Sequence, residues 1–434
     1  MIWAKEETMS RAEIEAMQLE RLKYRVKYAY ERVPYYKQKM DRAKVKPQDI
    51  KTLDDIQKLP FVTKQDFRDT YPFGMFAVPK NELVRIHASS GTTGKPTVVG
   101  YTRNDMDYWI ESVARVACMG GAMPDDVAQI CFGYGMFTGA LGLHEGLTKV
   151  GLAVIPASVG NSKRQMMYMQ DMGTTLLVAT PSYAMHLVEL IKEQGVDPAR
   201  DLQVKTALCG GEGMSEGLRR SLVEAWGPQM RVTQNYGMSE LNGPGVSGEC
   251  LEFNGMHINE DLFLAEVIDP ETGEVLPEGE KGELVITCLM KEALPLIRYR
   301  TRDITALHKE PCPCGRTTTR MEALSGRADD MLIIRGVNVF PSHIEEVLES
   351  FDKISPHYQI TLDTKDYLDT ALIQVELNDA ELLDSYARMN QLEREISRRM
   401  RRAIGLDCKI KLEAPGSLPR FEGKARRVID NRKQ

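Results

Sequence analysis

A short loop of glycine and hydroxylated residues is the stretch of the sequence best suited to chemistry. It runs Ser89-Ser-Gly-Thr-Thr-Gly-Lys-Pro96 and lies between two β-type runs, residues 83–87 and 97–101. Backbone N–H groups, hydroxyls and one ammonium can converge on an anion in such a loop, so the sequence predicts a phosphate site. Two residues separate the glycines and proline follows the lysine, which excludes a GxxxxGK[ST] P-loop. An ordinary turn of the same composition is the alternative.

Three further glycine-rich segments follow β-type runs directly. They are Phe132-Gly-Tyr-Gly, Cys209-Gly-Gly-Glu-Gly and Asn235-Tyr-Gly-Met-Ser-Glu240. In a parallel sheet, ligands bind at the carboxyl ends of the strands. These three segments are therefore expected to contribute to a ligand site.

An aromatic pair follows the first of these runs. Tyr134 and Phe137 could clamp an aromatic ring, and the glycines nearby, including Gly139, leave room beside them. Packing of the same pair in the protein core is the alternative.

Four residues in polar, turn-rich segments have the types that bind zinc: Cys250, His257, Cys312 and Cys314. Three thiolates and one imidazole form the closed tetrahedral set of a structural zinc site. The Cys-x-Cys spacing is tighter than usual, so unliganded thiols are the alternative; a disulfide between Cys312 and Cys314 suits a reducing compartment less well. The cysteines in apolar runs indicate buried thiols: Cys118, Cys131, Cys209 and Cys288.

The composition excludes several function classes. The chain has 434 residues, 42% of them hydrophobic, and 56 Lys plus Arg against 62 Asp plus Glu give a net charge of −6. This charge argues against general nucleic-acid binding. Because the sequence lacks both an apolar run of 18 residues and an apolar leader segment, we expect a soluble, cytoplasmic protein with no membrane partner.

Strand-type runs alternate with helix-length segments in the first two thirds of the chain. An N-terminal helix is predicted at residues 12–33, strands at 127–132, 152–155, 175–179, 204–208 and 231–235, and helices at 182–194 and 215–226. This alternation predicts an α/β fold whose mostly parallel sheets are covered by helices.

The pattern changes twice toward the C-terminus. Residues of about 250–325 contain β segments with turns, at 264–268, 283–287 and 304–307, and predict a β-rich subdomain. After Gly326-Arg-Ala-Asp-Asp330 a small α+β domain is predicted, with strands at 331–334, 358–362, 370–377 and 409–413 and helices at 341–351 and 379–404. We therefore expect an N-terminal domain of residues 1–326 and a mobile C-terminal domain of residues 327–434.

Several motifs in this order resemble those of the adenylate-forming (acyl-CoA synthetase) superfamily, and within it those of phenylacetate–CoA ligases. They are the loop at 89–96, Tyr236-Gly-Met-Ser-Glu240, Tyr299-Arg-Thr-Arg-Asp303, the 326–330 junction and Lys424 near the end. The closer likeness rests on Phe132-Gly-Tyr-Gly-Met-Phe-Thr-Gly139, Gly243-Pro-Gly-Val-Ser-Gly-Glu-Cys250, Cys312-Pro-Cys-Gly-Arg316 and Leu418-Pro-Arg-Phe-Glu-Gly-Lys424.

The resemblance implies that a carboxylic acid, such as phenylacetate or a related aryl acid, reacts with ATP to form acyl-adenylate and pyrophosphate. The thiol of coenzyme A then displaces AMP. Glu240 would hold Mg²⁺ and Lys424 would act at the α-phosphate, so these two are the expected catalytic residues. The resemblance also places a hinge at Asp329 and makes a homodimer the expected assembly.

The resemblance further implies a nucleotide-binding set. Tyr236 would stack on adenine, and Gly211 and Glu212 would frame the base. Asp303 and Arg327 would bind the ribose. Ser239 would touch the α-phosphate, and Gly336 would line the path of coenzyme A. The remaining expected binding residues are Ser89, Ser90, Gly91, Thr92, Thr93, Gly94, Lys95, Asn235 and Gly237.

Two other functions stay open at the level of the sequence. An adenylating enzyme of this kind can pass the activated group to a carrier protein or transfer AMP to a deazaflavin. A protein of the same fold can also bind nucleotide or zinc without catalysis. The presence of Thr93, Glu240, Asp303 and Lys424 together weighs against the non-catalytic alternative.

Overall fold

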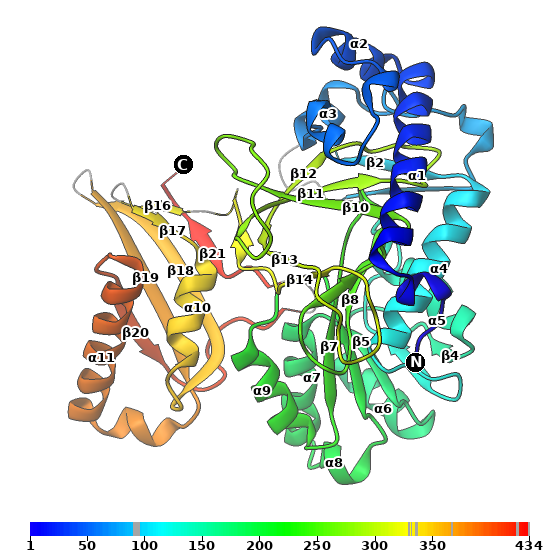
Figure 1. Ribbon diagram of the computed structural model, residues 1–434. Helices are drawn as coiled ribbons and strands as arrows, with labels where there is room; N and C mark the ends of the chain where they lie inside the picture. Colours follow the sequence, from blue (N-terminus) through cyan, green and yellow to red (C-terminus); the bar gives the residue numbers. More distant parts are fainter. Residues whose placement is uncertain are drawn as a thin grey trace.

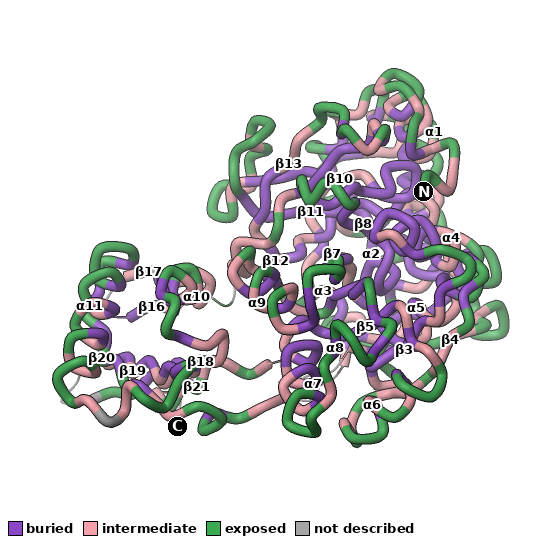
Figure 2. The backbone as a smooth tube through the Cα atoms, turned by 90° about the horizontal axis from the view of Figure 1, so that it is seen from below, coloured by how far each residue is buried: buried purple, intermediate pink, exposed green. Residues whose placement is uncertain are grey.

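The computed structural model describes residues 1–89, 96–328, 330, 332–334, 337–365, 368–421 and 425–432. Figure 1 shows a large unit that extends to strand β15 (Gly326–Arg327) and a smaller unit beside it that begins at β16 (Leu332–Ile334). Buried segments run through the interior of each unit in Figure 2. Among the described residues, no helix has the length and apolar character needed to cross a membrane.

The largest sheet has nine described strands in the order β13-β14-β9-β8-β7-β6-β5-β3-β4. Their bounds are β3 Val127–Ile130, β4 Ala153–Ile155, β5 Leu176–Ala179, β6 Thr206–Cys209, β7 Arg231–Met238, β8 Gly243–Glu249, β9 Met256–Ile258, β13 Leu307–His308 and β14 Arg320–Met321. Neighbouring strands in the part β7-β6-β5-β3-β4 are parallel, as the alternation with helices predicts. Neighbouring strands in the part β13-β14-β9-β8-β7 are antiparallel. All five predicted strands of this region are confirmed.

Helices cover both faces of this sheet because alternate side chains of each strand point to opposite sides. In β5, Leu176 and Val178 join the largest apolar cluster, whereas Leu177 and Ala179 join a second cluster. The first face carries α4 (Arg103–Met119) and α5 (Thr138–Val150). The second face carries α6 (Ser162–Asp171), α7 (Pro181–Glu193) and α9 (Glu216–Trp226), and α8 (Pro198–Asp201) follows α7. The predicted helices at 182–194 and 215–226 are confirmed.

The N-terminal helix α1 (Arg11–Arg32) confirms the helix predicted at 12–33. It begins at a capping box in which Ser10 and Glu13 exchange side-chain and backbone hydrogen bonds. Pro34 ends it and opens α2 (Pro34–Arg42), since proline is tolerated in the first turn of a helix. Helix α3 (Lys64–Asp69) completes this region.

The β-rich region divides between two sheets. Strands β10 (Phe263–Ile268), β11 (Gly282–Cys288), β12 (Tyr299–Thr305) and β15 form a sheet of their own, whereas β13 and β14 extend the large sheet. The strand predicted at 304–307 is divided between two strands: β12 ends at Thr305, where the chain leaves this sheet and then pairs as β13 with β14. A separate hairpin of β1 (Arg85–Ala88) and β2 (Val98–Tyr101) flanks the glycine-rich loop, as predicted.

The smaller unit packs two helices against a sheet ordered β20-β19-β18-β21. Its elements are β16, β17 (Val337–Val339), α10 (Pro341–Glu349), β18 (Ile354–Lys365), β19 (Leu368–Leu377), α11 (Tyr386–Ile404), β20 (Lys409–Glu413) and β21 (Val428–Asp430). The predicted elements are present, but the long helix does not begin at 379. Asp379 caps a 3-10 turn (Ala380–Asp384), and α11 starts after it. The division at residue 326 stays a prediction.

Candidate active site and candidate metal centre

The hairpin under the glycine-rich loop is closed by Ser89 and Thr97. Ser89 N–H donates to the Thr97 carbonyl at 3.0 Å, and Thr97 N–H donates to Ser89 Oγ at 3.1 Å. Ser90, Gly91, Thr92, Thr93, Gly94 and Lys95 lie outside the described residues. The structure therefore fixes the base of the predicted phosphate loop, and the roles of its six inner residues stay predictions.

Ser239 and Glu240 follow the carboxyl end of β7 and are both buried. Ser239 Oγ lies 3.1 Å from Thr138 Oγ1, at the start of α5. The turn between β7 and β8 needs Gly237, because a Cβ there would lie 1.8 Å from the Gly243 carbonyl oxygen. Close packing at this turn thus holds a hydroxyl and a carboxylate at the end of the parallel strands.

Lys291 is a component of this site that the sequence does not indicate. Its buried ammonium donates to the carbonyls of Glu240 at 3.0 Å and Leu241 at 3.2 Å, and it lies 4.9 Å from the centre of the Tyr101 ring. Burial lowers the pKa of Lys291. Lys291 therefore joins the segment after β7 to the end of β2. It lies about fifty residues from Glu240 in sequence and belongs to no motif, so the sequence does not reveal this contact.

Asp303, Tyr236 and Arg327 come together from three strands. Asp303 Oδ2 accepts from the Tyr236 hydroxyl at 2.7 Å, and Oδ1 accepts from Arg327 Nη1 at 2.9 Å. Pairing of β12 with β15 sets Asp303 opposite Arg327. Burial, reinforced by the charge of Asp303, raises the pKa of Tyr236 well above its usual value. The phenol is therefore a permanent donor that orients the carboxylate.

Glu212 joins the end of β6 to two distant backbone groups. Its Oε1 accepts from Ser182 N–H at 2.8 Å, and Oε2 accepts from Ala425 N–H at 3.1 Å. Gly211 before it has φ +83°, which favours glycine, and Asn235 Nδ2 donates to the Cys209 carbonyl at 2.8 Å. Lys424 lies outside the described residues, but Ala425 next to it is held at this strand end.

The aromatic pair lies in the segment before α5. Tyr134 is half-buried with its hydroxyl 3.1 Å from His144 Nδ1, and burial raises its pKa to about 12. Phe137 is 42% exposed, and its ring covers Gly139, where a Cβ would lie 2.3 Å from the ring. Phe137 is therefore not a core residue, and His144 is a polar neighbour that the sequence did not single out.

Polar contacts link the smaller unit to helices α7 and α9. Glu189 accepts from Arg420 Nε at 3.1 Å and lies 3.0 Å from His357 Nε2. Ser215, the cap of α9, donates to Glu349 of α10. The predicted hinge Asp329 and Gly336 lie outside the described residues.

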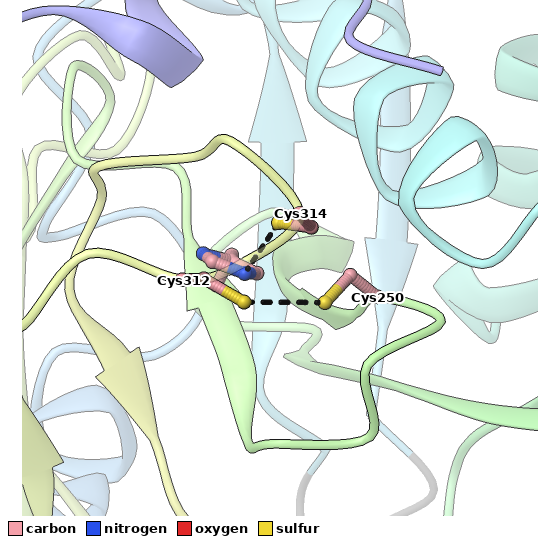
Figure 3. Close-up of side chains that lie close together, drawn as sticks. Cys250, Cys312 and Cys314 are labelled. Carbon is pink, nitrogen blue, oxygen red and sulfur yellow. Dashed lines mark hydrogen bonds between the residues drawn. The ribbon is translucent and has the colours of Figure 1, made fainter.

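The four predicted zinc ligands lie together, with their ligand atoms all within 4.8 Å of one another. Figure 3 labels the three cysteines of this set. Cys250 Sγ is 3.7 Å from Cys312 Sγ, and Cys314 Sγ is 3.5 Å from His257 Nε2. Burial alone would raise the pKa of the Cys314 thiol, but hydrogen bonds from His257 and Arg316 lower it to about 5. The group is chemically able to hold one soft divalent metal ion.

Comparison with known proteins identifies the class. Residues 12–288 match the family of AMP-binding enzymes, and residues 336–432 match the C-terminal domain of AMP-binding enzymes. The chain belongs to the AMP-binding enzyme family, which confirms the resemblance that its motifs indicate.

Particular relatives narrow this class. The chain is 47% identical over 441 residues to the phenylacetate-coenzyme A ligase of Thermus thermophilus, covering 98% of each chain. It is 44% identical over 427 residues to the Escherichia coli K12 phenylacetate-coenzyme A ligase, covering 98% of this chain and 97% of the other. A crystal structure of 2-hydroxyisobutyryl-CoA ligase with 2-HIB-AMP in the postadenylation state is 30% identical, with a TM-score of 0.91 over 99% of this chain and 92% of that chain.

Proposed function

We propose that the protein is an ATP-dependent acid–CoA ligase whose substrate is phenylacetate or a related aryl acid. The observation that carries this proposal is identity of 43–47% to four phenylacetate-coenzyme A ligases, each matched over 98% of this chain. The acid carboxylate attacks the α-phosphorus of ATP, and pyrophosphate leaves. The thiol of coenzyme A then attacks the acyl carbonyl, and AMP leaves.

The adenosine half of ATP binds at Tyr236, Asp303 and Arg327. Asp303 accepts from the Tyr236 hydroxyl through Oδ2 and from Arg327 through Oδ1, and a carboxylate held in this way suits recognition of the ribose hydroxyls. Arg327 contacts the same sugar, and Tyr236 stacks on the base beside Gly211. The paired strands β12 and β15 support this arrangement by holding the carboxylate and the guanidinium in register.

The phosphates bind between the 89–96 loop and the end of β7. Glu240 provides a buried carboxylate, a hard oxygen donor that suits Mg²⁺, and the buried Ser239 hydroxyl contacts the α-phosphate. When bound, Mg²⁺ would neutralise phosphate charge as it develops in the transition state. Lys291 positions Glu240 through the backbone, and Thr92, Thr93 and Lys95 receive the β- and γ-phosphates.

The position of the C-terminal tail supports the assignment of Lys424 to the first half-reaction. Glu212 holds Ala425, the neighbour of Lys424, at the strand end that carries the proposed adenine site. The TM-score to 2-hydroxyisobutyryl-CoA ligase is 0.91 in the postadenylation state and 0.73 in the thioesterification state. We infer that this chain has the arrangement used for adenylation and that rotation at Asp329 then brings Gly336 to the path of coenzyme A.

The acyl group binds beside Tyr134, Phe137 and Gly139. The exposed face of the Phe137 ring and the half-buried Tyr134 offer aromatic surface next to the β1–β2 hairpin, since Met136 accepts hydrogen bonds from His87 and Ala88. We also propose, from the resemblance, a homodimer that acts in the cytoplasm.

Pyrophosphate release and thioester formation test this function across phenylacetate, benzoate and 2-hydroxyisobutyrate, each with and without coenzyme A. We expect phenylacetate to give both products, with kcat/KM at least about tenfold above benzoate, which lacks one methylene. Pyrophosphate release without any CoA thioester would show another acceptor. No acid-dependent release with any substrate would contradict the proposed function.

A further inference from the structure

Three separate segments bring a complete metal-ligand set to one place. Cys250 follows β8, His257 lies in β9, and Cys312 and Cys314 lie in the turn between β13 and β14. Pairing of β9 with both β8 and β14 brings these segments together, because Gly248 and Arg320 are both paired with His257. Figure 3 shows the three cysteine sulfurs close together, and the ligand nitrogen of His257 lies within 4.8 Å of them.

The spacing of these atoms fits a tetrahedron. With bonds of about 2.3 Å to sulfur and about 2.0 Å to nitrogen, a tetrahedral zinc site has S···S edges of about 3.8 Å and S···N edges of about 3.5 Å. The two corresponding distances are 3.7 Å between Cys250 Sγ and Cys312 Sγ and 3.5 Å between Cys314 Sγ and His257 Nε2. A disulfide would need sulfurs about 2.05 Å apart, so Cys250 and Cys312 are not bonded to each other.

Neighbouring groups donate to the three sulfurs and orient the imidazole. Backbone N–H groups of Glu252, Cys314 and Arg316 donate to the sulfurs of Cys250, Cys312 and Cys314, in each case from two residues further along. Arg316 Nη1 also lies 3.6 Å from Cys314 Sγ. His257 Nδ1 lies 3.2 Å from Thr318 Oγ1, so this nitrogen can donate while Nε2 faces the sulfurs.

We propose that Cys250, His257, Cys312 and Cys314 bind one structural Zn²⁺. Four protein ligands close the coordination shell, so the ion has no position for water or substrate and does not take part in catalysis. This site is independent of the proposed ligase function.

The ion fastens the edge of the large sheet to the N-terminal segment. Arg316, in the same turn as two ligands, pairs with Glu7 at 2.5 Å and donates to the Met1 carbonyl at 2.6 Å. Thr317 N–H donates to the Glu7 carbonyl at 3.0 Å. Loss of the ion would therefore loosen the turn at 312–316 together with residues 1–9.

Metal analysis of protein purified without added metal tests the site directly. We expect about one zinc and no stoichiometric iron per chain. The Cys312→Ser/Cys314→Ser variant should lose the zinc, whereas the control Cys408→Ala, which removes a buried thiol of the smaller unit, should keep it. Thermal unfolding of the double variant should shift downward, and limited proteolysis should cut residues 1–9 sooner.

Cobalt substitution keeps the proposal testable if the double variant does not fold. Wild-type protein loaded with Co²⁺ should show thiolate-to-cobalt charge transfer and the strong visible bands of a tetrahedral site. His257→Cys should retain the metal as a four-thiolate site, and His257→Phe should bind it more weakly. Metal-free wild-type protein that takes up no zinc, stoichiometric iron in place of zinc, or an octahedral cobalt spectrum would each overturn the proposal.

Discussion

The candidate metal centre and the candidate active site differ in what joins their residues. The metal ligands lie within 65 residues of one another, from Cys250 to Cys314, and the pairing of β8, β9 and β14 links their segments. The active-site residues extend from Ser89 to Ala425 and come from both units. In the active site, β12 is paired with β15, but other distant segments are joined by side-chain hydrogen bonds, such as that between Ala425 and Glu212. The metal centre is thus built on neighbouring strands of one sheet, whereas the active site is assembled from segments that are distant in sequence.

The contacts between the two units are consistent with the rotation that we propose between the half-reactions. The buried apolar cluster of the smaller unit contains residues from Ile334 onward, and the buried residues of the two clusters in the large unit extend no further than Met321. Across the boundary, the described contacts of Glu189, Glu212 and Glu349 are polar. Polar interfaces of this kind resemble transient ones, which separate at small cost in free energy. The comparison therefore predicts that changes in one site leave the other intact.

The largest effect is expected from Lys424→Ala. Removal of the cation proposed for the α-phosphate should lower acid-dependent pyrophosphate release by about 10²- to 10³-fold. Thioester formation from supplied acyl-adenylate should change little, and the protein should keep its zinc. The exposed Lys409→Ala in β20 is the control. Equal loss of both half-reactions would contradict this role of Lys424.

A smaller effect is expected from Asp303→Asn. The substitution keeps the shape but removes the charge that accepts from Tyr236, Arg327 and, in our proposal, the ribose. Hydrogen bonds to charged groups contribute about 1.5–3 kcal/mol, so KM for ATP should rise roughly 10- to 100-fold. Asp269→Asn, a half-buried carboxylate after β10 and outside the proposed ribose site, should leave KM for ATP unchanged. An unaltered KM for ATP in Asp303→Asn would show that Asp303 does not bind the ribose.

Replacement of Phe137 by alanine should weaken binding of the acid and leave binding of ATP unchanged. Aromatic packing contributes about 1 kcal/mol, which corresponds to roughly a fivefold rise in KM for arylacetates in Phe137→Ala, with KM for ATP unchanged. The control is Tyr24→Ala, another exposed ring, in α1. The control should keep wild-type selectivity among acids. If Phe137→Ala also kept it, Phe137 would not line the acyl site.

The parallel half of the fold could be predicted from the sequence because its strands are continuous apolar runs between amphipathic helices. The antiparallel extension could not. Strand β8 reads Gly-Pro-Gly-Val-Ser-Gly-Glu, in which Val246 is the single β-branched residue. Its glycines instead allow close packing on α4, since a Cβ at Gly245 or Gly248 would lie within 2.7 Å of Ser112 or Val116. Only the packed structure explains that composition.

The sequence also predicts some residues of the candidate sites and not others. The metal ligands stand out because cysteine in polar, turn-rich segments has no packing explanation. The motif residues Tyr236, Asp303 and Arg327 meet as expected. Lys291 acts through backbone carbonyls, which any sequence provides, so its contact with Glu240 depends on tertiary structure alone.

The smallest effect is expected from Glu189→Gln, which weakens the boundary between the units without touching either site. Glu189 pairs with His357 and Arg420, and its side chain is 35% exposed. Ion pairs with this much solvent contact contribute at most about 1 kcal/mol, so adenylation should slow by no more than roughly fivefold. Thioester formation from supplied acyl-adenylate should be unchanged or faster, because the adenylation arrangement becomes less favoured.

The pH dependence of this contact gives a second measurement. Burial tends to raise the pKa of Glu189, but hydrogen bonding from His357 and the charge of Arg420 lower it overall. A carboxylate with a lowered pKa contributes its full stabilisation above its ordinary pKa and loses it as the pH falls through the lowered value. The part of the difference between wild type and Glu189→Gln that comes from the Glu189 charge should therefore shrink in acid, below about 4.5. The exposed Glu193→Gln, at the end of the same helix, is the control. A Glu189→Gln variant in which both half-reactions slow equally would show that the contact supports folding, not the arrangement of the two units.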